Sequence, residues 1–124
     1  MKIYPANPFS GRFSCPADKS ETLRCLLLSA LTEGEKIIDN PLIAEDTLSM
    51  AECLKKLCAE IRFEDDKFFV RGATDLFLGE TLDCGNSATT LRLLLGALSG
   101  FGVTATFTGD ESLQKRDFSD IIAT

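Results

Sequence analysis

Apolar residues with helical spacing mark the first half of this 124-residue chain. Over residues 19–32 the spacing i, i+3, i+4, i+7, i+8 predicts a helix with one buried face. That face is made of Leu23, Leu26, Leu27, Ala30 and Leu31. Gly34 is expected to end this helix.

Two further helices follow from the same kind of pattern. Glu45-Asp46-Thr47 offers candidate caps for a second helix. Its apolar face carries Met50, Cys53, Leu54, Leu57 and Cys58. A third helix has its face at Leu91, Leu94, Leu95 and Leu98, and Phe118, Ile121 and Ile122 begin another helical face.

Short runs of alternating or β-branched residues lie between the helices and predict strands at 36–39, 60–63, 67–71, 80–84 and 103–107. Asp65-Asp66 joins two of these runs, so we expect a hairpin there. Residues 17–72 then form a first unit with the order helix, strand, helix, strand, strand. Residues 73–124 begin a second unit in the same way and stop before completing it, whereas residues 1–16 form an initial strand region.

The two predicted units contain an internal repeat with an offset of 67 positions. The pairs are Ser20 and Ser87, Thr22 and Thr89, Leu26 and Leu93, and Ala30 and Ala97. In both units a polar segment stands where a helix begins. The first turn of a helix presents unpaired N–H groups and the positive end of the helix dipole, and both favour phosphate or carboxylate.

Composition removes several classes of function. The chain is 44% hydrophobic and 26% charged, which is typical of a globular domain, and its net charge of −6 with scattered basic residues argues against a nucleic-acid surface. It contains no histidine, so a Ser-His-Asp or Cys-His site is excluded within this chain. No metal-ligand spacing, membrane span or signal peptide is visible, so we expect no metal, no cofactor, no membrane contact and a cytoplasmic location. The five cysteines are expected to be reduced, with three of them, Cys25, Cys53 and Cys58, on apolar helix faces.

Three polar segments are candidates for chemistry. Lys19, Ser20 and Arg24 can converge on one side of a helix start and suit a phosphate group. The segment Gly85-Asn86-Ser87-Ala88-Thr89 has the small residues that let a ligand approach backbone N–H groups. Lys115-Arg116 adds two cations. Taken singly, each has an ordinary alternative: a capped helix with solvated charges for the first two, and a solvated loop of mixed charge for the third.

Together, and in this order, these motifs resemble the 5-enolpyruvylshikimate-3-phosphate synthase family from about residue 10 to residue 116. The motifs are Pro16-Ala17-Asp18-Lys19-Ser20 with Arg24, Asn40-Pro41-Leu42 with Glu45-Asp46-Thr47, Gly85-Asn86-Ser87-Ala88-Thr89 with Arg92, and Thr108-Gly109-Asp110-Glu111-Ser112-Leu113 with Lys115-Arg116. The resemblance implies an α/β (α+β) fold of repeated βαβαββ units, part of one domain of an inside-out α/β barrel. It also implies that residues 1–16 belong to the other domain and that this chain is an amino-terminal fragment.

The family transfers the enolpyruvyl group of phosphoenolpyruvate to the 5-hydroxyl of shikimate 3-phosphate. The resemblance implies Lys19 as the catalytic lysine that contacts both substrates, with Ser20 and Arg24 binding shikimate 3-phosphate. It implies Asn86, Ser87, Ala88, Thr89 and Arg116, together with Lys19, as the phosphoenolpyruvate site. The acid and base groups come from the second domain, so we expect the fragment alone to be inactive and prone to self-association, and the full enzyme to be a monomer.

Ala88 stands where many family members have glycine, and alanine there is associated in the family with poor binding of glyphosate. The resemblance therefore implies a glyphosate-tolerant parent enzyme. Two other functions remain open at this point: a stand-alone module for phospho-anions or assembly that kept the fold without the chemistry, and a nucleic-acid enzyme such as an RNA-terminal phosphate cyclase. The net charge and the absence of histidine argue against the second of these.

Overall fold

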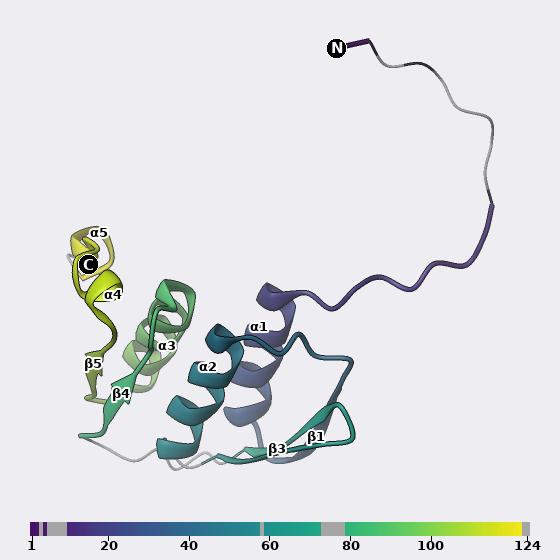
Figure 1. The fold of residues 1–124 in the computed structure, drawn as a ribbon. Coiled ribbons are helices and arrows are strands. Elements are labelled where there is room, and N and C mark those ends of the chain that lie inside the picture. Colours follow the sequence, from purple (N-terminus) through teal and green to yellow (C-terminus); the bar gives the residue numbers. More distant parts are fainter. Residues whose placement is uncertain (3, 5–9, 58, 73–78, 123–124) are drawn as a thin grey trace.

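The computed structural model describes residues 1–2, 4, 10–57, 59–72 and 79–122, in which three helices lie side by side between two small sheets. The elements in chain order are α1 (Lys19–Ala30), β1 (Gly34–Asp39), α2 (Glu45–Lys56), β2 (Glu60–Glu64), β3 (Lys67–Gly72), β4 (Thr81–Asp83), α3 (Ala88–Phe101), β5 (Thr106–Thr108), α4 (Glu111–Gln114) and α5 (Ser119–Ile122). The described residues before α1 run away from this body and form neither helix nor strand (Figure 1). The assignment of residues 1–16 to another domain stays a prediction.

The first sheet has the order β1-β3-β2, and both pairs of neighbours are antiparallel. The expected hairpin is confirmed, because β2 and β3 are joined through Asp65 and Asp66, whose φ angles are 49° and 57°. Two successive residues in the left-handed region are typical of the tight turn that matches the twist of paired strands. The strand register places Ile61 opposite Val70, and both side chains are buried beneath the helices.

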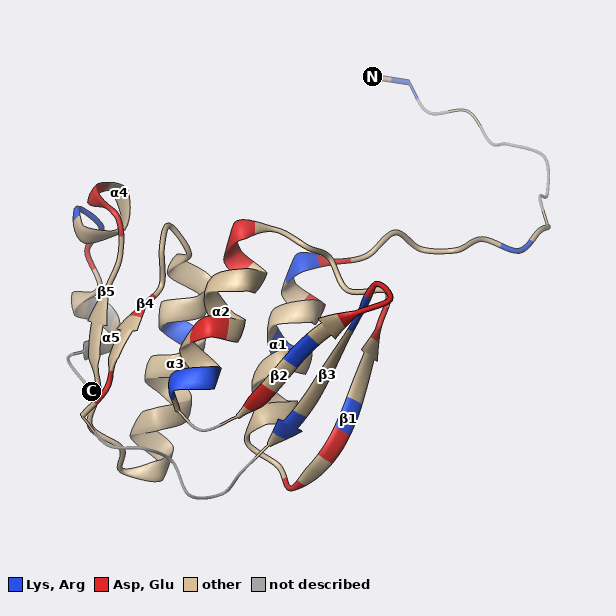
Figure 2. Ribbon diagram, turned by 60° about the horizontal axis from the view of Figure 1, so that its bottom comes forward, with Lys and Arg blue, Asp and Glu red and all other residues tan. Residues whose placement is uncertain are grey.

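Charged residues of both signs lie along all three strands of this sheet (Figure 2). Arg62 lies within salt-bridge distance of Glu35 and Glu64, and Arg71 pairs with Glu35 and Glu60. These side chains are about half exposed, so each pair contributes little to stability. The sheet thus buries one face against the helices and leaves the other to solvent.

The core lies between the helices and the inner face of the sheet, and it continues to β4. Its fully buried large side chains come from every layer: Leu23, Leu26, Met50, Leu54, Leu57, Phe68, Val70, Leu82, Leu94 and Leu113. The apolar positions that were expected on the faces of the first two helices and that the structure describes are in this core, except that Leu31 is only partly buried against it and Cys25 is exposed. The prediction that Cys25 lies on an apolar helix face is therefore wrong.

The other cysteines divide between surface and core. Cys53 and Cys84 are buried, Cys15 is exposed, and Cys58 lies outside the described residues. The Cys53 thiol donates to the carbonyl oxygen of Asp83 at 3.2 Å. Its hydrogen bond with Cys84, together with burial, raises the pKa of Cys84, so this thiol stays protonated.

The first helix ends earlier than its pattern predicts. α1 stops at Ala30, and Gly34, with φ of 88°, begins β1 instead of ending the helix. The ammonium of Lys36 turns back on this bend and donates to the carbonyl oxygens of Thr32, Glu33 and Gly34. A cation is favourable here because the last carbonyls of a helix have no partners within the helix.

The second unit is a strand-helix-strand crossover, in which β4 and β5 pair in parallel with Thr81 opposite Thr106. The strand expected at 103–107 is displaced to Thr106–Thr108. Gly102 ends α3 in the left-handed conformation, and the N–H of Val103 returns to the carbonyl oxygen of Leu98 at 3.0 Å. Val103 is therefore part of a helix terminus of the Schellman type and cannot begin a strand.

Candidate functional site

The amino-terminal ends of α1, α2 and α3 meet at one end of the helical layer. α1 begins after Asp18, whose carboxylate accepts the N–H of Glu21 at 2.8 Å. α3 begins after Ser87, whose hydroxyl oxygen accepts the N–H of Thr90 at 3.2 Å. α2 begins after Ala44, a residue without a capping oxygen. Each start directs unpaired N–H groups and the positive end of a helix dipole toward the same region.

At the offset of 67 the two helices start two residues out of step. Ser87 is the N-cap of α3, whereas Ser20 is the second residue of α1. Two pairs of residues at this offset are nevertheless buried in both helices: Leu23 with Thr90, and Leu27 with Leu94. The repeat is therefore a repeat of the apolar face, while the polar segments at the two starts are built differently.

Buried threonines tie the three helix starts together. The Thr22 hydroxyl accepts the N–H of Leu42 at 2.9 Å, and the hydroxyl of Thr47 lies 2.9 Å from the carbonyl oxygen of Leu42. Thr90 donates to the carbonyl oxygen of Asp46 at 3.3 Å. All three threonines are at most 4% exposed. The loop before α2 is thus fixed to α1, and the first turn of α2 is fixed to α3.

A pocket of about 280 Å³ lies where the three helix starts meet. Its lining comes from α1, α2, α3 and the segment after α4: Lys19, Glu45, Asp46, Asn86, Ser87, Ala88, Thr89 and Arg116. All six residues that the resemblance implies for phosphoenolpyruvate are in this set. Segments almost a hundred residues apart in the chain are thereby brought to one small cavity.

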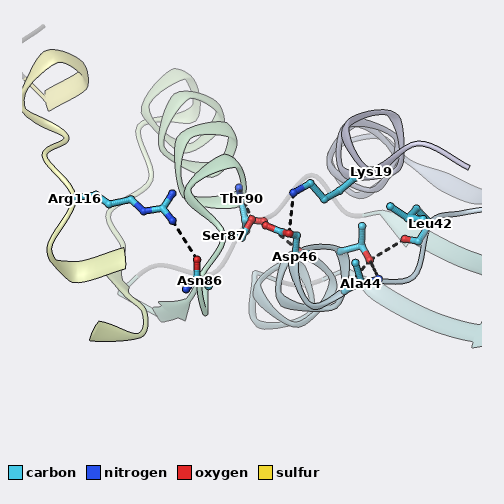
Figure 3. A network of polar contacts seen from close by, with 9 residues as sticks. Lys19, Leu42, Ala44, Asp46, Asn86, Ser87, Thr90 and Arg116 are labelled. Atoms are coloured by element: carbon cyan, nitrogen blue, oxygen red, sulfur yellow. Dashed lines mark hydrogen bonds and ion pairs between the residues drawn. The ribbon is translucent and has the colours of Figure 1, made fainter. Parts of the chain in front are cut away.

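Two polar chains cross the wall of this pocket (Figure 3). In the first, the ammonium of Lys19 donates to Asp46 Oδ2 at 3.0 Å. In the second, Arg116 Nη2 donates to Asn86 Oδ1 at 3.2 Å, and Asn86 Nδ2 donates to Asp110 Oδ2 at 2.6 Å. Lys19 and Arg116 therefore face the cavity from opposite sides, each held by a polar partner.

The pKa of Asp46 lies below its ordinary value. The largest cause is a hydrogen bond from the Ser87 hydroxyl, followed, against the opposing effect of burial, by the hydrogen bond and charge of Lys19 and the charge of Arg116. Asp46 is consequently ionised at neutral pH. The charged lining residues are Lys19 and Arg116 against Glu45 and Asp46, so their formal charges cancel.

The segment that carries Arg116 is ordered by a short helix that the sequence pattern did not predict. Asp110 caps α4 by accepting the N–H of Leu113 at 2.8 Å, and its own N–H donates to the carbonyl oxygen of Gly85 at 2.9 Å. The cap hydrogen bond, with help from Asn86, lowers the pKa of Asp110. A Cβ at Gly109 would collide with the carbonyl oxygen of Gly85, so only glycine allows this approach. The alternative of a solvated loop is therefore wrong for Glu111–Gln114, which form a helix, whereas the charged side chains of Glu111, Lys115 and Arg116 are exposed as that alternative expects.

Ser20 and Arg24 lie elsewhere on α1. Ser20 is half-buried, Arg24 is exposed, and neither lines the pocket at Lys19. The structure thus gathers the residues implied for phosphoenolpyruvate in one cavity and leaves those implied for shikimate 3-phosphate beside it on the same helix.

Asp46 is the residue of the pocket that the sequence pattern assigned to another role, as a helix cap. In the structure the hydroxyl of Thr47 accepts the N–H of Ala44 at 3.0 Å, while the Asp46 carboxylate accepts from Lys19 across the pocket. The only sequence signal was its place in the motif Glu45-Asp46-Thr47. Its partner, 27 positions earlier, could not be found from the pattern.

Two solved structures that superpose on this chain are EPSP synthases. One, from Acinetobacter baumannii, superposes with a TM-score of 0.80 and 30% sequence identity over 91% of this chain and 27% of that one. The fold is thus that of an α/β protein of the enolpyruvyl transferase type. None of the helices in the described ranges has the length and apolar character needed to cross a bilayer.

Sequence comparisons agree with this class. The model of the family EPSP synthase (3-phosphoshikimate 1-carboxyvinyltransferase) matches residues 3–124, and the chain belongs to this family. A 3-phosphoshikimate 1-carboxyvinyltransferase from Thermus thermophilus is 46% identical over 99% of this chain, and one from Caldicellulosiruptor saccharolyticus is 42% identical over 94%. The chain spans 30% and 27% of the length of these two relatives.

Proposed function

We propose that this chain supplies the amino-terminal part of a 3-phosphoshikimate 1-carboxyvinyltransferase and that its pocket binds phosphoenolpyruvate. The observation that carries the proposal is the meeting of three helix starts with Lys19 and Arg116 around one cavity. Unpaired N–H groups, a point charge and a guanidinium fork together match a small phosphorylated carboxylate.

The size of the pocket supports a small ligand. Its volume of about 280 Å³ is near the lower end of the range of roughly 300–1,000 Å³ that small-molecule sites occupy. The buried side chain of Ala88 forms part of the lining, so the methyl group limits the space further. A ligand with few heavy atoms and several negative charges fits both the volume and the polar character of the wall.

The position of Lys19 supports a role in contact with both substrates. It stands at the first position of α1, with the pocket on one side, and Ser20 and Arg24 follow on the same helix. In the proposed reaction C3 of phosphoenolpyruvate takes up a proton, while the 5-hydroxyl of shikimate 3-phosphate adds to C2 and loses its own proton. The resulting tetrahedral intermediate expels phosphate as C3 gives up a proton, which restores the double bond. Holding two anions side by side is the main task of such a site, and Lys19 lies between the two proposed subsites.

The charges of this chain are not enough for that task. Because the charged lining residues cancel, the three helix dipoles are the main attraction that this chain offers to a dianion. The acid and base groups, and further cations, would come from the part of the relatives' length that this chain does not span. We therefore expect no turnover from the 124-residue chain alone.

The proposal can be tested by calorimetric titration of this chain with phosphoenolpyruvate, comparing the original with Lys19→Met and Lys55→Met. Lys55 is the matched control, because its ion pair with Glu52 is exposed on α2 away from the pocket. Saturable binding that is weakened in Lys19→Met and unchanged in Lys55→Met supports the proposal. Binding that Lys19→Met leaves intact, or no binding by the folded chain, contradicts it.

The shikimate 3-phosphate subsite needs a separate titration. We expect Arg24→Ala and Ser20→Ala to weaken binding of shikimate 3-phosphate and to leave the affinity for phosphoenolpyruvate unchanged. A stand-alone phospho-anion module would instead bind inorganic phosphate as well as either substrate and would show no such division between variants.

Exposed apolar side chains support the expected self-association. Four apolar side chains on α1, β1, the loop before α2 and α2 itself are more than 40% exposed: Leu28, Ile37, Ile43 and Leu48. Apolar surface of this kind favours contacts between copies or with further protein. Sedimentation over a range of concentrations tests this, and a monomer at every concentration would contradict it.

A further inference from the structure

Asp46 is a carboxylate in the wall of a pocket that we propose for an anion, and it therefore needs an explanation. It accepts a hydrogen bond from the Lys19 ammonium at 3.0 Å and another from the Ser87 hydroxyl. The first donor is at the start of α1 and the second caps α3. One acidic side chain on α2 thus holds a donor from each of the two neighbouring helices (Figure 3).

We propose that Asp46 is a positioning residue, which fixes the Lys19 ammonium at the pocket wall so that the bound anion meets a cation already in place. The inference rests on the proposed function of the pocket as an anion site. Asp46 itself does not bind the anion, and its effect on affinity acts through Lys19.

The position of Asp46 is well determined by its surroundings. Its carbonyl oxygen accepts the Thr90 hydroxyl at 3.3 Å, so main chain and side chain are both tied to α3. The neighbouring Thr47 is fully buried and bonded to the loop before α2. A carboxylate on such a rigid turn gives the lysine a fixed partner.

Stability does not explain the ion pair. The side chains of Lys19 and Asp46 are 44% and 27% exposed, and pairs with this much solvent contribute little to the free energy of unfolding. A role of Asp46 as a helix cap does not explain the pair either, because the N–H of Ala44 donates to the hydroxyl of Thr47. What remains is the effect on Lys19, whose long and flexible stem loses much conformational freedom when an anion immobilises it. Holding the lysine beforehand removes part of that loss.

Glu45 provides a matched control for the opposing effect of charge. It lines the same pocket from the preceding position and carries the same charge, but Lys19 makes its ion pair with Asp46. Glu45→Gln therefore removes repulsion toward an anion without removing the partner of Lys19. Asp46→Asn removes both, so the difference between the two variants isolates positioning.

The experiment is a double-mutant cycle measured as the dissociation constant of phosphoenolpyruvate for the 124-residue chain. We expect Asp46→Asn to weaken binding about tenfold, which corresponds to about 1.4 kcal/mol. We expect Glu45→Gln to strengthen it about twofold because only repulsion is lost. In a Lys19→Met background, Asp46→Asn should no longer weaken binding. Circular dichroism verifies that each variant is folded.

Two results of the cycle would overturn the inference. If Asp46→Asn strengthens binding as Glu45→Gln does, the carboxylate only repels the anion. If Asp46→Asn weakens binding equally with and without Lys19, it supports the fold and does not act through the lysine.

A second measurement keeps the inference testable if the chain binds no phosphoenolpyruvate, a result that would refute the proposed function alone. NMR relaxation of the Lys19 Cε methylene reports the order of the side chain without any ligand. A lower order parameter in Asp46→Asn, with no change in Glu45→Gln, supports positioning. Equal order in the original chain and in Asp46→Asn overturns it.

Discussion

Replacing Thr22 by valine tests whether buried hydroxyl groups hold the helix starts together. Valine keeps the shape and the β-branch, so it creates no cavity and changes helix propensity little. The hydroxyl of Thr22 accepts the N–H of Leu42 at 2.9 Å and donates to the carbonyl oxygen of Asp18 at 2.8 Å. That carbonyl oxygen keeps a second donor, the N–H of Thr22, at 3.1 Å. The loss therefore falls on the N–H of Leu42.

An N–H group left without a partner in a partly buried place costs about 1–3 kcal/mol. We expect Thr22→Val to lower the free energy of unfolding by about 2 kcal/mol. With an unfolding entropy of about 2.1 cal/mol/K per residue, this loss lowers Tm by about 8 °C. Urea and thermal unfolding measure both quantities, and the dependence on urea should stay unchanged because the surface exposed on unfolding is the same.

Thr32→Val is the matched control. The hydroxyl of Thr32 donates to the carbonyl oxygen of Leu28 at 2.9 Å, but the residue is exposed, so water can replace the bond. We expect a change within about 0.5 kcal/mol, as for most surface substitutions. If Thr22→Val is as stable as the original chain, or if both variants lose the same amount, the reasoning about buried hydroxyl groups is refuted.

Further substitutions test other parts of the structure. Gly72→Ala should destabilise the chain by about 2–3 kcal/mol in urea unfolding, because a Cβ there meets the backbone carbonyls at the end of α1. Gly100→Ala, where a Cβ would meet nothing, should stabilise the chain by about 0.5–1 kcal/mol. Equal effects of the two variants would contradict the packing argument. The lowered pKa of Asp46 contributes stability that is present above the pKa of this group in the unfolded chain, near 4, and is lost as pH falls through the lower folded value. The free energy of unfolding should therefore fall less between neutral and acid pH in Asp46→Asn than in the original chain. The same dependence on pH in both chains would show that the ionised Asp46 is not stabilised in the folded state. Ala88→Gly in the full-length enzyme should strengthen inhibition by glyphosate, measured as the inhibition constant in competition with phosphoenolpyruvate, because the methyl group of Ala88 lines the pocket. Low-micromolar inhibition of the original enzyme would contradict the expected tolerance.

The elements that follow from local pattern were predicted well. The helices at α1 and α2 and the hairpin through Asp65 and Asp66 have strong periodicity and a turn of a defined type. The errors occur where distant residues decide the outcome. α1 ends at Ala30, where Lys36 and Gly72 lie against its last carbonyls, and neither of these contacts is visible in the pattern of the helix itself.

The site shows the same division. The motifs identified Lys19, Arg116 and the segment from Asn86 to Thr89, and the structure gathers them in one pocket, although their binding roles stay a prediction. The pattern could not identify the partner of Lys19, because a carboxylate near a helix start is usually a cap. α4 was missed because a helix of four residues has no periodicity, and its stability comes from the contacts of Asp110 with Gly85 and Asn86.

The two sheets also differ in how they can form during folding. β2 and β3 are joined by a two-residue turn, so their pairing closes a very short loop and belongs to the events that take about 1–10 μs. β4 and β5 pair in parallel, and the whole of α3 lies between them. Contacts of this kind require a larger loss of chain entropy before they gain any stability. The loop from Gly85 to Ser87 lies within that crossover and the segment of Arg116 follows it, so we expect the wall of the pocket that they form to assemble after the β2–β3 hairpin.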